Sequence, residues 1–88
     1  MDRKAVEAAL KQLQQEHAQS RYRDPQSQAQ AQQLIADLER QLQHPDSAEA
    51  RADLHQRATA AIREFEVEHP QLTAALTQIV SAFSSMGI

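Results

Sequence analysis

The stretch Glu64-Phe65-Glu66-Val67-Glu68-His69-Pro70-Gln71-Leu72 decides how the C-terminal half of this chain folds. Proline disfavours helical backbone in the residue before it and is well tolerated at the first position of a helix. The stretch therefore predicts that one helix ends beside His69 and that the next begins at Pro70. No spacer is expected between them, so the two helices should either cross at a steep angle or form one kinked rod on the order of 60 Å long. We interpret His69 and Pro70 as a structural joint.

The rest of the chain is divided in the same way by Pro25 and Pro45. Alanine, glutamine, leucine and glutamate dominate, and Gly87 is the one glycine, a composition that favours helix throughout. We expect helices over residues 2–19, 24–43, 46–68 and 70–86. Apolar residues recur on one face of each expected helix, for example Val6, Leu10 and Leu13 in the first. The prediction is one all-α domain over residues 1–88, a small bundle or helical hairpin with a break or kink at the joint.

Three helix ends have sequence signals. Asp24 followed by Pro25 is typical of an N-cap and the first helical position. The run Asp46-Ser47-Ala48-Glu49 is typical of a capping box. At the other end, a left-handed Gly87 would bring Ile88 against Phe83 and stop the last helix. A C-terminal tripeptide recognised by a partner is the alternative for this segment.

The second helix begins with a glutamine-rich segment, residues 26–33. Glutamine is a good helix former, so we expect an exposed first half of that helix. A polar surface for partners is the alternative.

The size of the chain limits its stability. A domain of 88 residues buries only about 60% of its unfolded surface. Scaffolds of this size often need a disulfide, a metal or a partner chain, and this sequence has no cysteine. A partner chain is the expected support.

The N-terminus is charged at Asp2, Arg3 and Lys4 with no apolar segment after it, so we expect a cytoplasmic protein without a signal peptide.

The last helix is the unusual one, because no charged residue occurs between Pro70 and Ile88. A helix without a charged face is usually covered on more than one side, and small residues four apart let another helix come close. Serines, threonines and glutamines interrupt the segment, which argues against a membrane span. The candidate interface consists of seven residues of this helix: Leu72, Thr73, Leu76, Thr77, Val80, Ser81 and Phe83.

Several other classes of function find little support. The net charge is −3, and Arg21 and Arg23 form a tight basic pair rather than a cluster, so nucleic-acid binding is not expected. No glycine-rich loop is available for phosphate. The serines near the C-terminus have no histidine close in sequence. We therefore expect no catalysis, no cofactor and no small-molecule substrate.

The histidines have both structural and functional interpretations. His17, His44 and His69 fall at expected helix C-termini, where they would complement the helix dipole. Glu66 and His69 also have the Glu-x-x-His spacing of helical di-metal sites, although such a site needs a second motif and further carboxylates. A metal-binding bundle therefore stays open as an alternative. His17 lies on the apolar face of the first helix, where it would be partly buried or form a pH-sensitive interface.

The segment Phe65-Glu66-Val67-Glu68-His69-Pro70-Gln71-Leu72, together with Met86-Gly87-Ile88, resembles a family of short bacterial proteins described only as a domain of unknown function. The resemblance covers essentially the whole chain and is specific in its last third. It implies a bacterial, cytoplasmic, all-helical protein and transfers no activity.

These observations predict a non-enzymatic helical interaction protein whose biological role they do not name. Its expected partner is a second copy, bound through the uncharged C-terminal helix in a dimer or higher oligomer. The alternative is a co-chaperone-like or adaptor subunit that binds a helix of another protein.

Overall fold

A computed structural model describes residues 3–44 and 47–85 of the chain. Within these residues it contains the helices α1 (Arg3–Gln19), α2 (Pro25–Gln43), α3 (Ala48–Phe65) and α4 (Pro70–Ser85). The predicted all-α fold is confirmed. Gly87 and Ile88, the predicted helix stop, lie outside the described residues.

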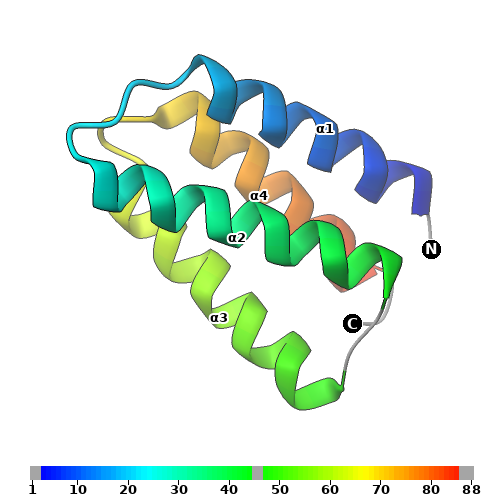
Figure 1. Ribbon diagram of the computed structural model, residues 1–88. Helices are drawn as coiled ribbons and strands as arrows, with labels where there is room; N and C mark the ends of the chain where they lie inside the picture. The colour runs from blue at the N-terminus through cyan, green and yellow to red at the C-terminus, as the bar shows by residue number, and fades with distance from the viewer. Residues whose placement is uncertain (1–2, 45–46, 86–88) are drawn as a thin grey trace.

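The helices run alternately up and down, so that each lies antiparallel to its neighbour in the chain (Figure 1). α1 packs against α2 and α4, and α3 packs against the same two helices. α1 therefore lies diagonally across the bundle from α3, and α2 from α4. The contact between α1 and α4 is the most extensive of the four.

The core is built from the apolar faces that the sequence pattern predicts. Val6, Leu13 and Ile79 are almost completely buried, and apolar residues from all four helices surround them. Ile62 and Val80 are only partly buried at the margin of this core. Burial of such residues stabilises the fold by about 1.5–3 kcal/mol per large apolar side chain.

Two helix starts are capped by side chains. Asp24 precedes Pro25, as predicted, and its carboxylate accepts a hydrogen bond of 2.8 Å from the Ser27 amide. α3 begins at Ala48 rather than at residue 46, and its N-cap is Ser47, whose hydroxyl accepts from the Ala50 amide at 3.2 Å. Asp46, the first residue of the expected capping box, lies outside the described residues.

The joint between α3 and α4 differs from the prediction. α3 ends at Phe65 instead of residue 68, and residues 66–69 form a loop that reverses the chain. Phe65 is the last residue of α3 in the core, whereas Val67 is 85% exposed, so continuing the helix would bury nothing. A rod on the order of 60 Å is excluded, because the longest dimension of the bundle is 34 Å.

His69 joins the two helices through its backbone. Its amide donates to the Phe65 carbonyl at 2.8 Å, which satisfies a free carbonyl at the end of α3. Its carbonyl accepts from the Thr73 amide at 3.0 Å, which forms the first turn of α4. Pro70, at the first position of α4, has no amide hydrogen to leave unsatisfied.

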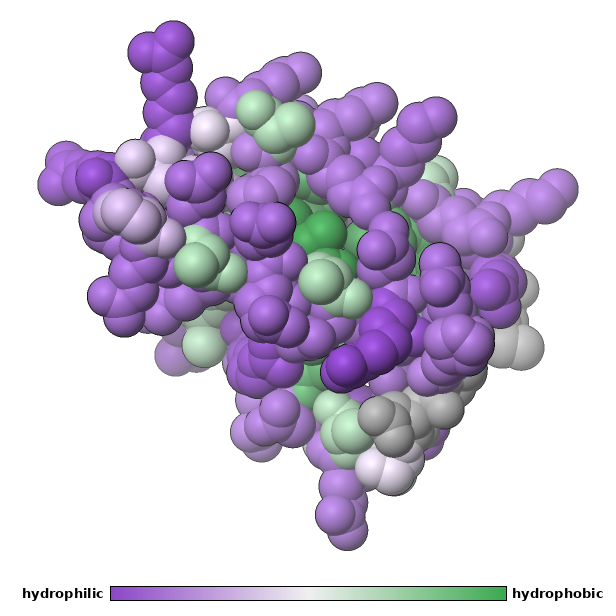
Figure 2. All heavy atoms as spheres, in the orientation of Figure 1, coloured by the Kyte–Doolittle hydropathy of each residue, from purple (hydrophilic) through white to green (hydrophobic). Residues whose placement is uncertain are grey.

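The glutamine-rich segment, residues 26–33, is the first half of α2 and is largely exposed. The face of the molecule around α2 is covered mainly by hydrophilic side chains (Figure 2). This agrees with the expectation that the segment forms an exposed helix.

Candidate functional site

The exposed side of α4 is the first candidate site. α4 lies against α1 on one side and α3 on the other, and its remaining side faces outward. We define the α4 outer face by its exposed residues: Gln71, Ala74, Thr77, Gln78, Ser81 and Ser84. None of these side chains is charged, although the face is accessible to solvent.

A groove runs between this face and α1. Its wall on α1 includes Ala5, Ala8 and Gln12, and its wall on α4 includes Ala74 and Ser81. All the described residues that line it are alanine, glutamine, threonine or serine. We call this surface the α1–α4 groove. Its small side chains allow the axis of another helix to approach closely.

The seven residues predicted for the interface divide into two groups. Leu72, Thr73, Leu76 and Phe83 are buried inside the bundle, so they are part of its own core. Val80 is partly buried beside that core, whereas Thr77 and Ser81 are exposed. An interface on the folded monomer therefore has to use the outer face of α4 rather than its buried apolar side. The sequence alone does not separate the two sides, because both lack charge.

The second candidate site is an aromatic cluster at the end of the bundle that carries the loops 20–24 and 66–69. The Tyr22 ring lies 4.8 Å from the His69 ring, 5.5 Å from the His17 ring and 6.1 Å from the Phe65 ring, measured between centroids. His69 and Phe65 also meet edge to face at 5.9 Å. We call these four residues the ring cluster. Through it, loop 20–24 contacts loop 66–69.

Polar contacts support the ring cluster. A hydrogen bond of 2.7 Å joins His17 Nδ1 and the Tyr22 hydroxyl. Arg23 in the first loop pairs with Glu68 in the second at 2.8 Å. Burial lowers the pKa of His17 from its ordinary value, and burial raises the pKa of Tyr22, against the opposing effect of a hydrogen bond with Ser20. His17 is therefore favoured in its neutral form.

The histidines occupy different positions from one another. His17 lies in the last turn of α1 and His44 follows α2 as its C-cap, in agreement with the helix-end prediction. Glu66 is the C-cap of α3. His69 follows it by three residues and lies directly before α4. His69 contacts the end of α3 through its backbone amide, which donates to the Phe65 carbonyl at 2.8 Å, and its ring packs on Tyr22.

The Glu66 and His69 pair was the candidate for a metal. Glu66 is exposed in the loop, and His69 belongs to the ring cluster. Over residues 3–44 and 47–85 the structure has no group of three or more histidine, cysteine or acidic side chains placed to hold a metal ion. Among the described residues, Glu66 and His69 therefore lack the further ligands that a metal site of this kind requires.

Asp37 is a buried charged residue that the sequence interpretation missed. Its side chain is 11% exposed and accepts hydrogen bonds from Arg57 at 2.6 Å and from Gln33 at 3.0 Å. Burial alone would raise the pKa of Asp37, but these hydrogen bonds and the charges of Arg57 and Arg40 outweigh it and leave the pKa below its ordinary value. The group links α2 to α3. Its position between the apolar residues Leu34 and Leu38 was the available signal.

A family model described as "Domain of unknown function (DUF4404)" matches residues 6–88. The chain belongs to the DUF4404 family. The expected membership in a domain family of unknown function is confirmed, and the DUF4404 match contains α2, α3 and α4 entirely and α1 from Val6 onward. No curated protein and no solved structure matches the chain.

None of the helices formed by the described residues of this DUF4404 chain has the length and apolar character required to cross a bilayer. Arg21 and Arg23 are exposed on the first loop, and Arg23 is paired with Glu68.

Proposed function

We propose that this DUF4404 protein is a non-enzymatic helical interaction protein that self-associates through the α4 outer face and the α1–α4 groove. The observation that carries the proposal is an exposed surface without charge. α1, α2 and α3 each present exposed charged side chains, such as Lys11, Glu39 and Arg63, whereas the outer face of α4 presents none. Depletion of charged residues is the compositional mark of the centre of protein interfaces.

A second copy is the partner that this surface favours. An interface between two identical copies brings each surface residue near its own counterpart or near another residue of the same patch. A charged patch would repel itself in such an arrangement, but uncharged alanine, serine, threonine and glutamine side chains do not. A dimer would also bury additional surface, of which a chain of 88 residues buries little by itself.

Absence of cysteine supports a cytoplasmic location as part of the same proposal.

Light scattering over a dilution series tests the proposal. We expect a dimer or higher oligomer at micromolar concentration. Ser81→Lys and Gln78→Lys place a charge in the surface, and both positions are exposed in the monomer, so the variants should fold. We expect them to be monomeric, with an unchanged helical circular dichroism spectrum.

Gln32→Lys is the matched control, because Gln32 is exposed on α2, away from the groove. It should leave the solution mass of the oligomer unchanged. A wild-type protein that is a folded monomer at every concentration contradicts self-association. The same surface would then be assigned to a helix of another protein, as in an adaptor or co-chaperone-like subunit.

A further inference from the structure

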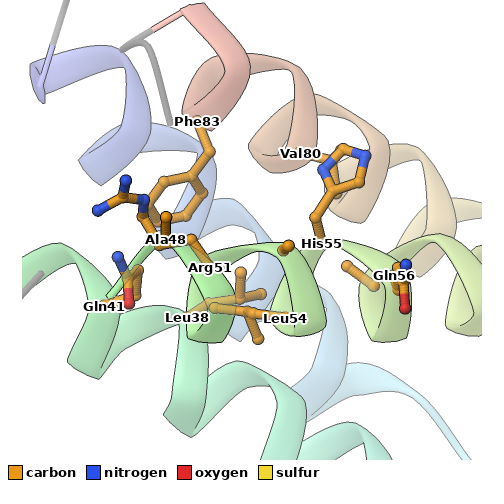
Figure 3. Close-up of a pocket in the computed structure, with 11 residues that line it drawn as sticks. Leu38, Gln41, Ala48, Arg51, Leu54, His55, Gln56, Val80 and Phe83 are labelled. Atoms are coloured by element: carbon orange, nitrogen blue, oxygen red, sulfur yellow. The ribbon is translucent and has the colours of Figure 1, made fainter. Parts of the chain in front are cut away.

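A cavity lies where α2, α3 and α4 meet, apart from the α1–α4 groove. Its volume is about 380 Å³. Its apolar lining comes from all three helices and consists of Leu38 of α2, Ala48, Ala52, Leu54 and Ala58 of α3, and Val80 and Phe83 of α4. Figure 3 shows Phe83 reaching from α4 toward α3. No described residue lines both the cavity and the groove, so the two sites are separate.

Small side chains on α3 leave this space open. Ala48, Ala52 and Ala58 line it, where longer apolar side chains would fill part of the volume. Protein interiors are packed with few voids larger than a water molecule, and an unfilled apolar space lacks the dispersion contacts of packed atoms. An apolar molecule in the cavity would therefore add contacts that the chain does not make by itself.

The charge of the lining limits the class of ligand. Arg51 lines the cavity but already takes part in another interaction within the molecule, and the same is true of Gln41. His55 and Gln56, the other described polar residues of the lining, are exposed to solvent, and no described lining residue is acidic. A charged group that left water here would gain no oppositely charged partner, which is unfavourable. The lining therefore favours a neutral ligand.

The volume decides between a small molecule and a helix of another protein. One turn of an α-helix, with a diameter of about 10–12 Å and a pitch of about 5.4 Å, occupies roughly 400–600 Å³. The cavity is smaller than one such turn. It lies within the range of about 300–1,000 Å³ that is typical of small-molecule sites, which are also mostly apolar.

We propose that this cavity binds a small neutral molecule of mainly hydrocarbon character, packed against Leu54, Val80 and Phe83. Apolar contact supplies the affinity, and the lack of an available charged partner selects against carboxylates and amines. A single hydroxyl group on the ligand would lie toward the exposed residues His55 and Gln56, where water can satisfy its hydrogen bonds.

1-Octanol is the probe, titrated below its solubility limit into the full-length protein. Backbone amide and methyl resonances are followed by NMR during the titration. We expect saturable shifts confined to the residues that line the cavity, Leu54 and Val80 among them. Octanoate and octylammonium carry the same chain with a negative and a positive charge. Each should bind at least about five-fold more weakly, because its charge loses water without gaining a partner.

A variant that fills the cavity tests the location of the site. Ala52 lines the cavity but is itself exposed, so Ala52→Phe should occupy the space without overpacking the core and should abolish saturable binding of octanol. Ala36→Phe is its matched control at an exposed position of α2 outside the cavity, and it should bind octanol as the wild type does. Circular dichroism checks that both variants keep the helical fold.

The proposal is overturned if octanol produces no saturable shifts, or shifts scattered over the whole surface. It is also overturned if folded Ala52→Phe binds octanol as tightly as Ala36→Phe. Equal or tighter binding of octanoate or octylammonium rejects the neutral ligand. Ser81→Lys, which tests self-association, should bind octanol as the wild type does, since Ser81 lines the groove and not the cavity.

Discussion

The ring of Tyr22, in the loop before α2, packs against the ring of His69, in the loop before α4, with the ring centroids 4.8 Å apart and the planes tilted by 38°. This contact joins two turns that are distant in the sequence but lie at the same end of the bundle (Figure 1). His69 also connects α3 to α4 through its amide and carbonyl, so the contact links the loop before α2 to the connection between α3 and α4. The joint between α3 and α4 is therefore held in part by a residue that precedes α2.

Removal of the Tyr22 ring should destabilise the fold. Tyr22→Leu loses three ring contacts and the hydrogen bond with His17, and we expect the free energy of unfolding to fall by about 1–2 kcal/mol. Tyr22→Phe keeps the ring contacts and should cost about 1 kcal/mol. Urea denaturation at fixed protein concentration measures both. The neighbouring Arg21 is exposed, so Arg21→Ala should have an effect within about 0.5 kcal/mol. Equal stability of Tyr22→Leu and wild type would show that the ring cluster contributes nothing.

Acidification should destabilise the protein through His17. The pKa of His17 is lowered in the fold, so the unfolded chain binds a proton there more readily than the folded chain. The stability that comes from the neutral ring is fully present above the unfolded pKa of about 6.5 and is lost as pH falls below that value toward the folded pKa. We expect the urea midpoint to decrease between about pH 7.5 and pH 5.

His17→Gln should flatten this part of the pH profile, whereas His55→Gln, at an exposed position of α3, should preserve it. A profile that is equally steep in wild type and His17→Gln would assign the pH dependence to another group.

Much of the core follows from the sequence because its signal is local. Val6, Leu10 and Leu13 recur at helical spacing, and the structure buries all three against the other helices. The position of Pro70 predicts a break beside His69, but no local signal places the end of α3 at Phe65. Glu66 and Glu68 are good helix formers, and only the solvent exposure of this turn and the packing of His69 on Tyr22 select a loop. These are tertiary effects, so local propensity predicts a helix three residues too long.

The candidate sites show the same division. The absence of charge in α4 is visible in the sequence, but which side faces out depends on where α1 and α3 pack. Asp37 looks like an ordinary surface residue of a helix until Arg57 of α3 is placed beside it. A pocket lined by Leu38, Leu54 and Phe83 is formed by three helices, so no short sequence motif could reveal it.

The contact between Asp37 and Arg57 should contribute more to stability than the other pair that Arg57 makes. Arg57→Gln leaves a largely buried carboxylate with weaker partners, and we expect a loss of about 1–2 kcal/mol in the free energy of unfolding, since the half-exposed guanidinium limits the effect. Asp53 pairs with the same guanidinium at 3.8 Å but is 69% exposed, so Asp53→Asn should cost less than about 0.5 kcal/mol. Thermal denaturation of both variants compares the two pairs, and equal losses would contradict a special role for Asp37.

The pH dependence of this contact has the opposite range from that of His17. The pKa of Asp37 is lowered in the fold, so its stabilisation is fully present above the ordinary value of 3.8 and is lost as pH falls through the folded pKa. Asp37→Asn should therefore reduce the loss of stability below about pH 4, and it should leave the change near pH 6 unaltered. A normal acid transition in this variant would assign the transition to other carboxylates.

Pro70→Ala tests whether proline alone makes the joint. The substitution removes the steric restriction on His69 and would permit continuous helix through residues 66–69. We expect the loop to remain, because a continuous helix would pull Leu72, Leu76 and Ile79 out of the core, at a cost far larger than the conformational preference of one residue. The variant should lose about 0.5–1 kcal/mol, mainly because its unfolded chain gains conformational freedom.

Small-angle scattering checks the shape at matched concentration, and Pro70→Ala should match the wild-type scattering profile. Pro25→Ala, at the first position of α2, is the control for losing a helix-starting proline elsewhere. A marked increase in the radius of gyration of Pro70→Ala alone would show that the proline, rather than the packing of α4 on α1 and α3, holds the chain in its compact form.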